Sequence, residues 1–272
     1  MLRLPDVTLV TIDCAQPVAA LLALERCLAM GDFADVLLVT DASIDAAGVR
    51  TIPIGPLHSR AEYSEFVMRR LAALIDTSHA LLVQWDGFII DAAEWRDEFL
   101  DWDYIGAPWG YGDGMDVGNG GFSLRSRRLV EACEDPAIAD FEPEDERICR
   151  TYRPYLETRY DIRFAPLELA RRFSVEHVES PYSTFGFHGA FNLWRALDAG
   201  GLEQLVSALP SAALARQDVL ALAYRCWNQR RTHEAECLLA RIVALHPDHT
   251  GAELMLAEVR ADLAVAGTDG RS

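Results

Sequence analysis

The segment QWDGF, residues 84–88, puts a carboxylate directly after a strongly apolar stretch. Residues 79–84 (HALLVQ) are typical of a buried strand, so Asp86 is expected just past the carboxyl end of that strand. Open α/β sheets bind their ligands at this edge. A carboxylate there can hold a divalent cation, and the cation can hold a diphosphate. The alternative is that Asp86 is an ordinary turn residue.

A second segment, VGNGGFSLR at residues 117–125, carries three glycines within four residues. Glycine lets a backbone approach a ligand closely. The spacing is not the G-x-G-x-x-G of dinucleotide sites, and no G-K-[ST] follows as in a phosphate-binding P-loop. The segment therefore predicts a loop, which is either a plain turn with positive φ or the lining of a ligand site.

Acidic residues crowd the start of a predicted helix in FEPEDERICR, residues 141–150. The helix dipole favours acids at that position, so capping accounts for part of the pattern. One carboxylate could instead point into a cleft as a general base. The dipole lowers the pKa of such a carboxylate, whereas neighbouring acids raise it.

A histidine between small and aromatic residues, His188 in FGFHG, is the fourth candidate. Neutral imidazole is a common metal ligand. A lone histidine is more often structural, so both interpretations stay open at this point.

Taken in order, the four segments resemble the motifs of the GT-A class of nucleotide-sugar glycosyltransferases. Those enzymes carry an aspartate motif after a sheet strand, a glycine-rich loop, a Glu-Asp motif and a late metal-binding histidine. More closely, QWDGF, YIGAPW, GNGGFSLRS, PEDERIC and TFGFHG resemble an uncharacterised bacterial family related to those transferases. The resemblance covers roughly residues 5–195 and implies an α/β fold of GT-A type with a mainly parallel sheet.

The resemblance implies roles for individual residues. Asp86 matches the metal-binding aspartate and His188 the late metal or diphosphate ligand, which implies Mn²⁺ or Mg²⁺ as cofactor. Gln84 stands where the family has another aspartate. Its amide can bond a ribose or sugar hydroxyl but adds no charge, so a metal-independent reaction is the alternative. Asp145 matches the catalytic base of inverting members, with Glu144 beside it.

The same resemblance implies the remaining contacts to the substrates. Thr11, Asp13 and, as a weaker candidate, Asp41 follow early strands, where the nucleotide usually binds. The other residues expected at the donor are Gln84, Trp85, Gly120 and Gly121. Asn119 is expected at the acceptor or sugar. Tyr104 and Trp109, in the aromatic stretch at 101–116, could stack on a sugar ring or could instead anchor the loop.

The implied reaction moves a sugar from a nucleotide-sugar donor to a hydroxyl group of a glycan, lipid-linked or protein acceptor. A cation would neutralise the diphosphate leaving group, and Asp145 would take the acceptor proton during an inverting attack. Two carboxylates also suit a glycosidase, but the order of the motifs favours transfer. The resemblance suggests surface-polysaccharide or glycoconjugate synthesis. The rival hypothesis is a catalytically inactive scaffold that docks partners through its C-terminal helices.

The elements that must position these residues alternate between strand and helix. Strands are predicted at residues 7–12, 36–40, 50–54 and 79–84. A helix with a leucine stripe is predicted to stop at Gly31, and another is predicted over 59–75 with a capping-box start. This alternation predicts a largely parallel α/β sheet flanked by helices. Residues 101–116, rich in Gly, Trp, Tyr and Asp, are expected to form a long ligand-binding loop.

The chain is predicted to divide into a GT-A-like domain at 1–204 and an α-helical segment at 205–272. Ala235, Leu239 and Pro247 have the spacing of a tetratricopeptide-like repeat. About one and a half repeats fit, too few to be stable alone. The segment is therefore either a helical cap or a docking surface for a protein partner. The tail from about residue 266 is expected to fray.

Composition narrows the classes of function. The chain has 272 residues and a net charge of −17, which argues against binding nucleic acid or anionic lipid. No apolar run is long enough for a transmembrane segment. Six scattered cysteines and no signal-peptide pattern predict a cytoplasmic protein with reduced thiols. Because a nucleotide sugar is an anion, donor binding is expected to depend on a metal ion or on arginines such as Arg60, Arg125 and Arg163.

Overall fold

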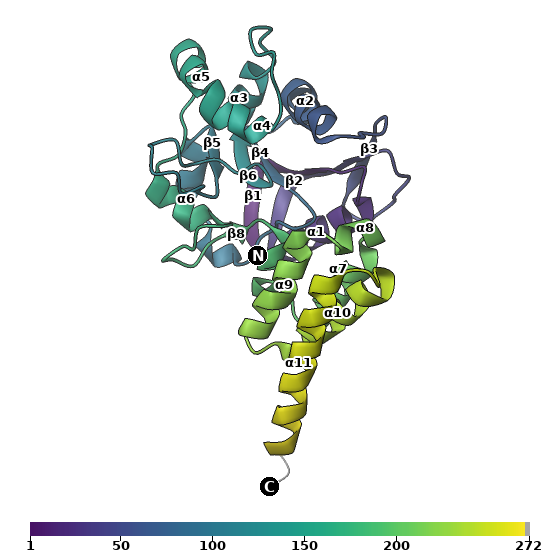
Figure 1. Cartoon of the computed structure of the whole chain (residues 1–272). Helices are drawn as coiled ribbons and strands as arrows, with labels where there is room; N and C mark the ends of the chain where they lie inside the picture. The colour runs from purple at the N-terminus through teal and green to yellow at the C-terminus, as the bar shows by residue number, and fades with distance from the viewer. Residues whose placement is uncertain (270–272) are drawn as a thin grey trace. The chain divides into compact units, whose positions relative to one another are not determined.

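The computed structural model describes residues 1–269, and the chain divides into two compact units, residues 1–188 and residues 189–272 (Figure 1). The boundary predicted after residue 204 falls inside helix α7 (Ala199–Ala208). The helical unit therefore begins earlier than predicted. Its first element is the 3₁₀ helix η5 (Ala190–Arg195), which packs on α9 (Gln217–Asn228).

A six-stranded sheet with the order β3-β2-β1-β4-β6-β5 forms the centre of the first unit. Strand β1 pairs in parallel with β2 and β4, and β2 pairs in parallel with β3, whereas β6 runs antiparallel to both β4 and β5. This arrangement confirms the predicted α/β fold with a mainly parallel sheet. The strands are β1 (Leu2–Ile12), β2 (Gly31–Thr40), β3 (Arg50–Pro53), β4 (His79–Val83), β5 (Tyr104–Gly106) and β6 (Phe122–Ser126).

The central strands form because their apolar runs are buried on both faces of the sheet. In β1 every residue from 7 to 12 is buried, and all of β4 is buried. Near-continuous β-branched and leucine runs of this kind are typical of parallel strands covered on both sides. The parallel strands β1, β2 and β4 end where the apolar run gives way to a polar residue, which is Asp13, Asp41 and Gln84 respectively. The polar residues therefore line one edge of the sheet.

Helices cover both faces of the sheet (Figure 1). Val67 of α2 packs in one core cluster with Val10 and Leu37, while α1 contacts β1, β2 and β4. The predicted capping of α2 is present, since Ser59 Oγ accepts the Glu62 N–H at 3.1 Å. The helices and 3₁₀ turns of this region are α1 (Pro17–Met30), α2 (Arg60–Arg70), η1 (Ala72–Leu74), η2 (Ala92–Glu94), η3 (Asp97–Asp101) and α3 (Arg127–Ala132).

The segments that carry the later motifs are short and irregular. The acidic motif forms the single turn α4 (Glu144–Glu146), which continues as the π-helical turn η4 (Arg147–Thr151). The predicted loop at 101–116 is interrupted by strand β5, so only part of it is a loop. The remaining elements of the unit are α5 (Arg153–Tyr160), α6 (Leu167–Phe173), β7 (Ser174–Val175) and β8 (Gly186–Phe187). Strands β7 and β8 pair in parallel, and His188 directly follows β8.

The second unit is helical, as predicted. Helix α10 packs against both α9 and α11, and its Ala235 and Leu239 are fully buried. The tetratricopeptide-like character of this packing stays a prediction. Helix α11 continues to Asp269, so residues 266–269 of the tail expected to fray are helical, and residues 270–272 lie outside the described residues. The further elements of the unit are α8 (Ser211–Leu214), α10 (Thr232–Leu245) and α11 (Thr250–Asp269).

None of the helices among the described residues is both long and apolar enough to span a bilayer. All six cysteines are free thiols in the structure.

Candidate active site

The polar residues that follow the strands converge on one edge of the sheet. Asp13 follows β1, Asp41 follows β2, and Asp86 lies three residues past β4. These strands are parallel, so their carboxyl ends share an edge. Antiparallel β6 begins at the same edge, because its first residue Phe122 pairs with Val83 at the end of β4. The glycine loop that precedes β6 is thereby brought beside the strand-following acids.

His188 is the centre of one cluster at this edge. Its Nε2 lies 3.4 Å from Asp86 Oδ1 and 3.2 Å from Gln84 Oε1, and its Nδ1 lies 2.9 Å from Glu176 Oε1. Burial disfavours the charged imidazole, but Asp86 and Glu176 outweigh this effect and raise the pKa of His188 to about 10. At neutral pH the ring is therefore an imidazolium held between two carboxylates.

The same atoms fit a divalent cation once the Nε2 proton leaves. Asp86 and Gln84 would offer oxygens and His188 a nitrogen, a set that suits Mn²⁺ or Mg²⁺. Glu176 would keep its bond to Nδ1–H, which is the usual outer partner of a metal-ligating histidine. Of the residues in this set, Asp86 alone supplies a charged ligand, because Gln84 stands where the resembled family has a second aspartate.

The protonated His188 makes the stability of the fold depend on pH. Its pKa is higher in the folded chain than the ordinary value of 6.5, so its contribution is complete below about pH 6.5 and is lost as the pH rises toward 10. We expect His188→Gln to lower the free energy of unfolding by on the order of 2–4 kcal/mol near pH 6, and by much less near pH 10. Urea unfolding of both proteins at each pH measures the difference. A difference that does not change with pH would contradict the account.

Asp145 and Glu144 form a second cluster, and they have different partners. Asp145 is half-buried, and its Oδ2 accepts the Gly120 N–H at 2.9 Å. Glu144 is buried, and its Oε1 accepts a bond from Arg125 Nη2 at 2.9 Å. Burial raises the pKa of Glu144, as does Asp145, while Arg125 opposes the rise. Glu144 is thus occupied by an ion pair, and Asp145 is the carboxylate that bonds the glycine loop and is more exposed to solvent.

The buried pair of Arg125 and Glu144 is expected to be important for stability. Arg125 is completely buried, so Glu144→Gln would leave its charge without a counterion. We expect this change to cost about 3–5 kcal/mol of unfolding free energy in urea titrations. The matched control is Glu146→Gln, a change two residues along the same turn at a half-buried position. Its free energy of unfolding is expected to stay within about 0.5 kcal/mol of the wild-type value. Equal effects of the two changes would mean that the pair is unimportant.

Two adjacent glycines separate the two clusters. A Cβ on Gly120 would overlap the Glu144 carboxylate, and a Cβ on Gly121 would overlap the His188 ring. Both positions therefore require glycine for close approach. Gly120 thus lies against the cluster of Asp145 and Glu144, and Gly121 lies against the His188 cluster. A substrate lying over this loop would contact both.

The acids after β1 and β2 extend the site along the sheet edge. Asp13 Oδ1 accepts the N–H groups of Ala15 and Gln16 at 2.7 and 2.6 Å. Burial raises the pKa of Asp13, and the charges of Asp86 and Asp41 raise it further. Asp13 is thus close enough to Asp86 and to Asp41 for the charge of each to act on it.

Several residues predicted to contact substrate have other surroundings. Tyr104 is fully buried in β5 and its ring packs over the Arg125 guanidinium, so it cannot offer a face to a sugar. Trp85 is 4% exposed and belongs to the core. Thr11 is also fully buried, and its hydroxyl has no hydrogen-bond partner within the described chain. Trp109 is half-buried beside the exposed Tyr111, with ring centroids 5.9 Å apart; the Arg150 guanidinium covers one face of the Tyr111 ring at 4.5 Å, and the Trp109 ring lies against Gly118.

Glu176 is the site residue that the sequence did not predict. It follows strand β7, whose partner β8 leads directly to His188. The amide of Asn119 also bonds Glu176, so the predicted sugar contact Asn119 instead holds the partner of His188. Tyr63 from α2 is a further missed contact, since its hydroxyl accepts a bond from Gln84 Nε2 at 3.1 Å. A carboxylate after a short strand was the available signal for Glu176.

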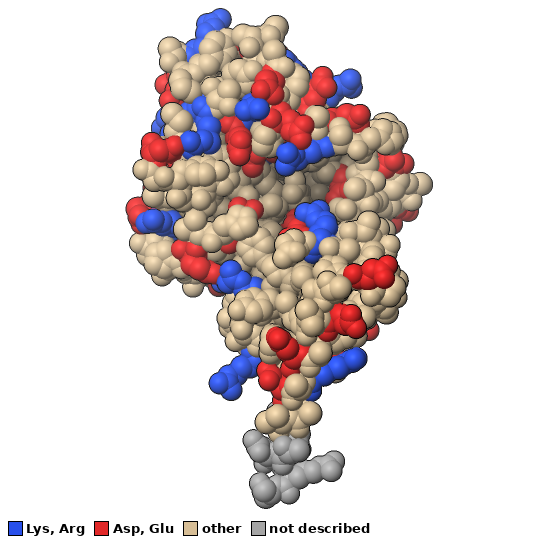
Figure 2. All heavy atoms as spheres, viewed as in Figure 1, with Lys and Arg blue, Asp and Glu red and all other residues tan. Residues whose placement is uncertain are grey.

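The arginines expected to neutralise a diphosphate have acidic or carbonyl partners. Arg125 is buried against Glu144, Arg60 pairs with Glu142 at 2.7 Å, and Arg163 bonds the carbonyl of Asp101. On the face drawn in Figure 2, blue and red side chains of the described residues are interspersed, without the broad basic patch that nucleic acid requires. These contacts favour a cation over the arginines as the partner of an anionic donor.

Comparison with known proteins identifies a family for this chain. Residues 46–188 match the family model described as "Protein of unknown function (DUF5672)". The chain belongs to the DUF5672 family. The matched part of this DUF5672 chain contains both clusters and the glycine pair and ends at His188, whereas Asp13 and Asp41 precede it.

Two further comparisons concern curated proteins and solved structures. The search of curated proteins finds no match for the DUF5672 chain. Among solved structures, the chain is similar to an active-site mutant of LgtC, with 13% sequence identity and a TM-score of 0.41. The alignment covers 74% of this chain and 94% of that chain.

Proposed function

We propose that this chain is a glycosyltransferase that moves a sugar from a nucleotide-sugar donor to a hydroxyl acceptor. The observation that carries the proposal is the pair Gly120–Gly121, which has a cluster suited to a divalent cation on one side and Asp145 on the other. The order of the sequence motifs, which resembles that of nucleotide-sugar transferases, also supports it.

The donor would bind along the edge from β2 to β4. Asp86 and His188, with the Gln84 amide oxygen, would hold Mn²⁺ or Mg²⁺, and the cation would neutralise the diphosphate leaving group. Asp13 and Asp41 would accept bonds from the hydroxyl groups of the nucleoside. Because Arg60, Arg125 and Arg163 have other partners, a metal-dependent donor site is the version that the contacts favour.

The acceptor would bind on the Asp145 side of the glycine pair. The Gly120 N–H fixes Oδ2 of Asp145, which orients the carboxylate to take the proton of an attacking hydroxyl. Attack from the face opposite the diphosphate would invert the anomeric centre. Glu144 would act as a positioning residue through Arg125. The rings of Trp109 and Tyr111 would stack on the acceptor sugar.

The proposed setting is bacterial surface-polysaccharide or glycoconjugate synthesis, with a glycan, lipid-linked or protein acceptor. A cytoplasmic location is part of the proposal and is supported by six free cysteines.

The test is an incubation of the full chain with a panel of nucleotide sugars and Mn²⁺, with detection of the free nucleotide. We expect release above the uncatalysed rate for at least one donor. An inactive scaffold would bind a nucleotide sugar but would not cleave it to give free nucleotide. If the chain binds no nucleotide sugar of the panel and releases no free nucleotide, the proposal is overturned.

A further inference from the structure

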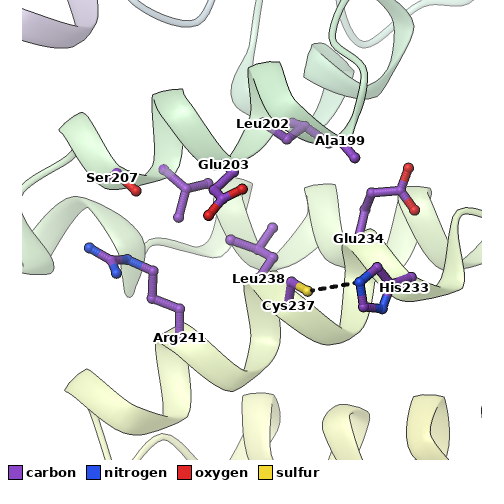
Figure 3. A pocket seen from close by; sticks show the side chains of 10 residues that line it. Ala199, Leu202, Glu203, Ser207, His233, Glu234, Cys237, Leu238 and Arg241 are labelled. Atoms are coloured by element: carbon purple, nitrogen blue, oxygen red, sulfur yellow. Dashed lines mark hydrogen bonds between the residues drawn. The ribbon is translucent and has the colours of Figure 1, made fainter.

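A group of metal-ligating side chains lies on helix α10 of the helical unit. His233, Glu236 and Cys237 each offer one ligand atom, and these atoms all lie within 4.8 Å of one another. His233 and Cys237 are four residues apart, so they share one face of the helix. Both also line a pocket of about 500 Å³ whose other wall is helix α7 (Figure 3).

The separation of the histidine and the cysteine matches the geometry of a metal site. His233 Nε2 lies 3.7 Å from Cys237 Sγ (Figure 3). In a tetrahedral zinc site with bonds of about 2.0–2.1 Å to nitrogen and about 2.3 Å to sulfur, the two ligand atoms are about 3.6 Å apart. The helix therefore already holds the pair at the spacing that an ion would impose.

The third ligand is held in place by a neighbouring helix. Arg260 of α11 contacts Glu236 Oε1 through both Nε and Nη2 at 3.0 Å. Because both contacts go to the same oxygen, Oε2 can serve an ion. Hydrogen bonds to a ligating carboxylate are the usual outer support of a metal site.

The charges around the sulfur favour a cation. Three carboxylates, Glu236, Glu203 and Glu234, are near enough for their negative charges to act on Cys237. Glu203 projects from α7 on the other side of the pocket (Figure 3). The negative potential of these carboxylates attracts a cation, and binding of a metal ion would displace the thiol proton to solvent.

We propose that His233, Glu236 and Cys237 bind a thiophilic divalent cation of the Zn²⁺ class. An imidazole nitrogen, a carboxylate oxygen and a thiolate sulfur would be the ligands, and a fourth position would be left for water or a further ligand. A sulfur ligand selects Zn²⁺ over Mn²⁺ and Mg²⁺. The cluster at the sheet edge offers only oxygens and one imidazole nitrogen, so the two sites would prefer different metals. The proposal is independent of the proposed transferase function.

The test is a titration of the full chain with Co²⁺, followed by displacement with Zn²⁺. A thiolate bound to Co²⁺ gives a sulfur-to-cobalt charge-transfer band, which a site of oxygen and nitrogen ligands does not give. We expect one equivalent of this band in the wild type and its loss in Cys237→Ser. We expect at least tenfold weaker binding in His233→Ala and in Glu236→Gln.

Two variants serve as controls for this titration. Glu234→Gln changes a carboxylate on the same helix that pairs with Arg231 at 3.1 Å; it removes one surrounding charge but no ligand, so it should weaken Co²⁺ binding far less than Glu236→Gln and should keep the band. Cys14→Ser removes the thiol that lies beside Asp41 at the sheet edge, and it should keep the band. Absence of the band in the wild type, or a band that survives Cys237→Ser and disappears in Cys14→Ser, would overturn the proposal.

Discussion

Replacement of Asp145 by asparagine is expected to lower turnover of the nucleotide-sugar donor by about 10²–10⁴-fold. Asparagine has the same shape and can still accept the Gly120 N–H, but it cannot take a proton from the acceptor. Donor affinity should change little, because Asp145 lies on the side of the glycine pair away from His188. Steady-state kinetics and equilibrium binding of the donor measure the two effects separately.

The control for this prediction comes from the same helical turn. Glu146→Gln keeps the backbone N–H that bonds Asp145 Oδ1 at 2.9 Å, so it should retain wild-type turnover. Glu144→Gln should act mainly on stability through Arg125. If the folded fraction of the Glu144→Gln protein had no turnover while the Asp145→Asn protein kept its turnover, the base would have to be Glu144.

The second large effect is expected at Asp86. Asp86→Asn removes the single charged metal ligand of the sheet-edge cluster and should weaken Mn²⁺-supported donor binding by about 10–100-fold. A chelator should weaken donor binding to the wild type to a similar extent. Because His188 carries a proton, Mn²⁺ binding should release one and should strengthen as the pH rises. Calorimetry in two buffers of different ionisation enthalpy measures the released proton.

Asp41→Asn is the matched control for Asp86→Asn. Asp41 follows a neighbouring strand and is exposed, and it contacts neither His188 nor Gln84 in the described site. Its replacement should leave Mn²⁺ affinity nearly unchanged. If neither the chelator nor Asp86→Asn changes the affinity for the donor, the metal hypothesis is wrong. The cationic His188 would then be the partner of the diphosphate.

The sheet and its ligand-binding edge could be predicted because their signals are local. The buried runs that end at Ile12, Thr40 and Val83 are visible in the sequence, and parallel pairing then brings the following acids together. Three glycines in four residues predicted a loop, either a plain turn with positive φ or the lining of a ligand site; in the structure Gly120 and Gly121 let this loop approach Glu144 and His188.

The partners within the site depend on contacts between distant segments, which the sequence does not show. Glu176 reaches His188 only because β7 pairs with β8, and Asn119 bonds Glu176 across more than fifty positions of chain. Tyr104 was expected on a sugar because it lies in an aromatic, glycine-rich stretch. A short strand inside that stretch buries it against Arg125 instead.

Charge alone was also a poor guide to the role of individual arginines. Arg125 was a reasonable candidate for a diphosphate until the fold paired it with Glu144 at complete burial. The helical segment was predicted from residue 205, whereas the compact helical unit starts at Gly189 and its first element is η5.

The most direct test of the central claim is a crystal structure of the chain with Mn²⁺ and a nucleoside diphosphate, with the metal located by its anomalous scattering. We expect an anomalous peak within bonding distance of Asp86 and His188 Nε2, with the diphosphate on the metal and the glycine pair between it and Asp145. A nucleotide bound away from this edge, or a metal peak that excludes both Asp86 and His188, would contradict the claim.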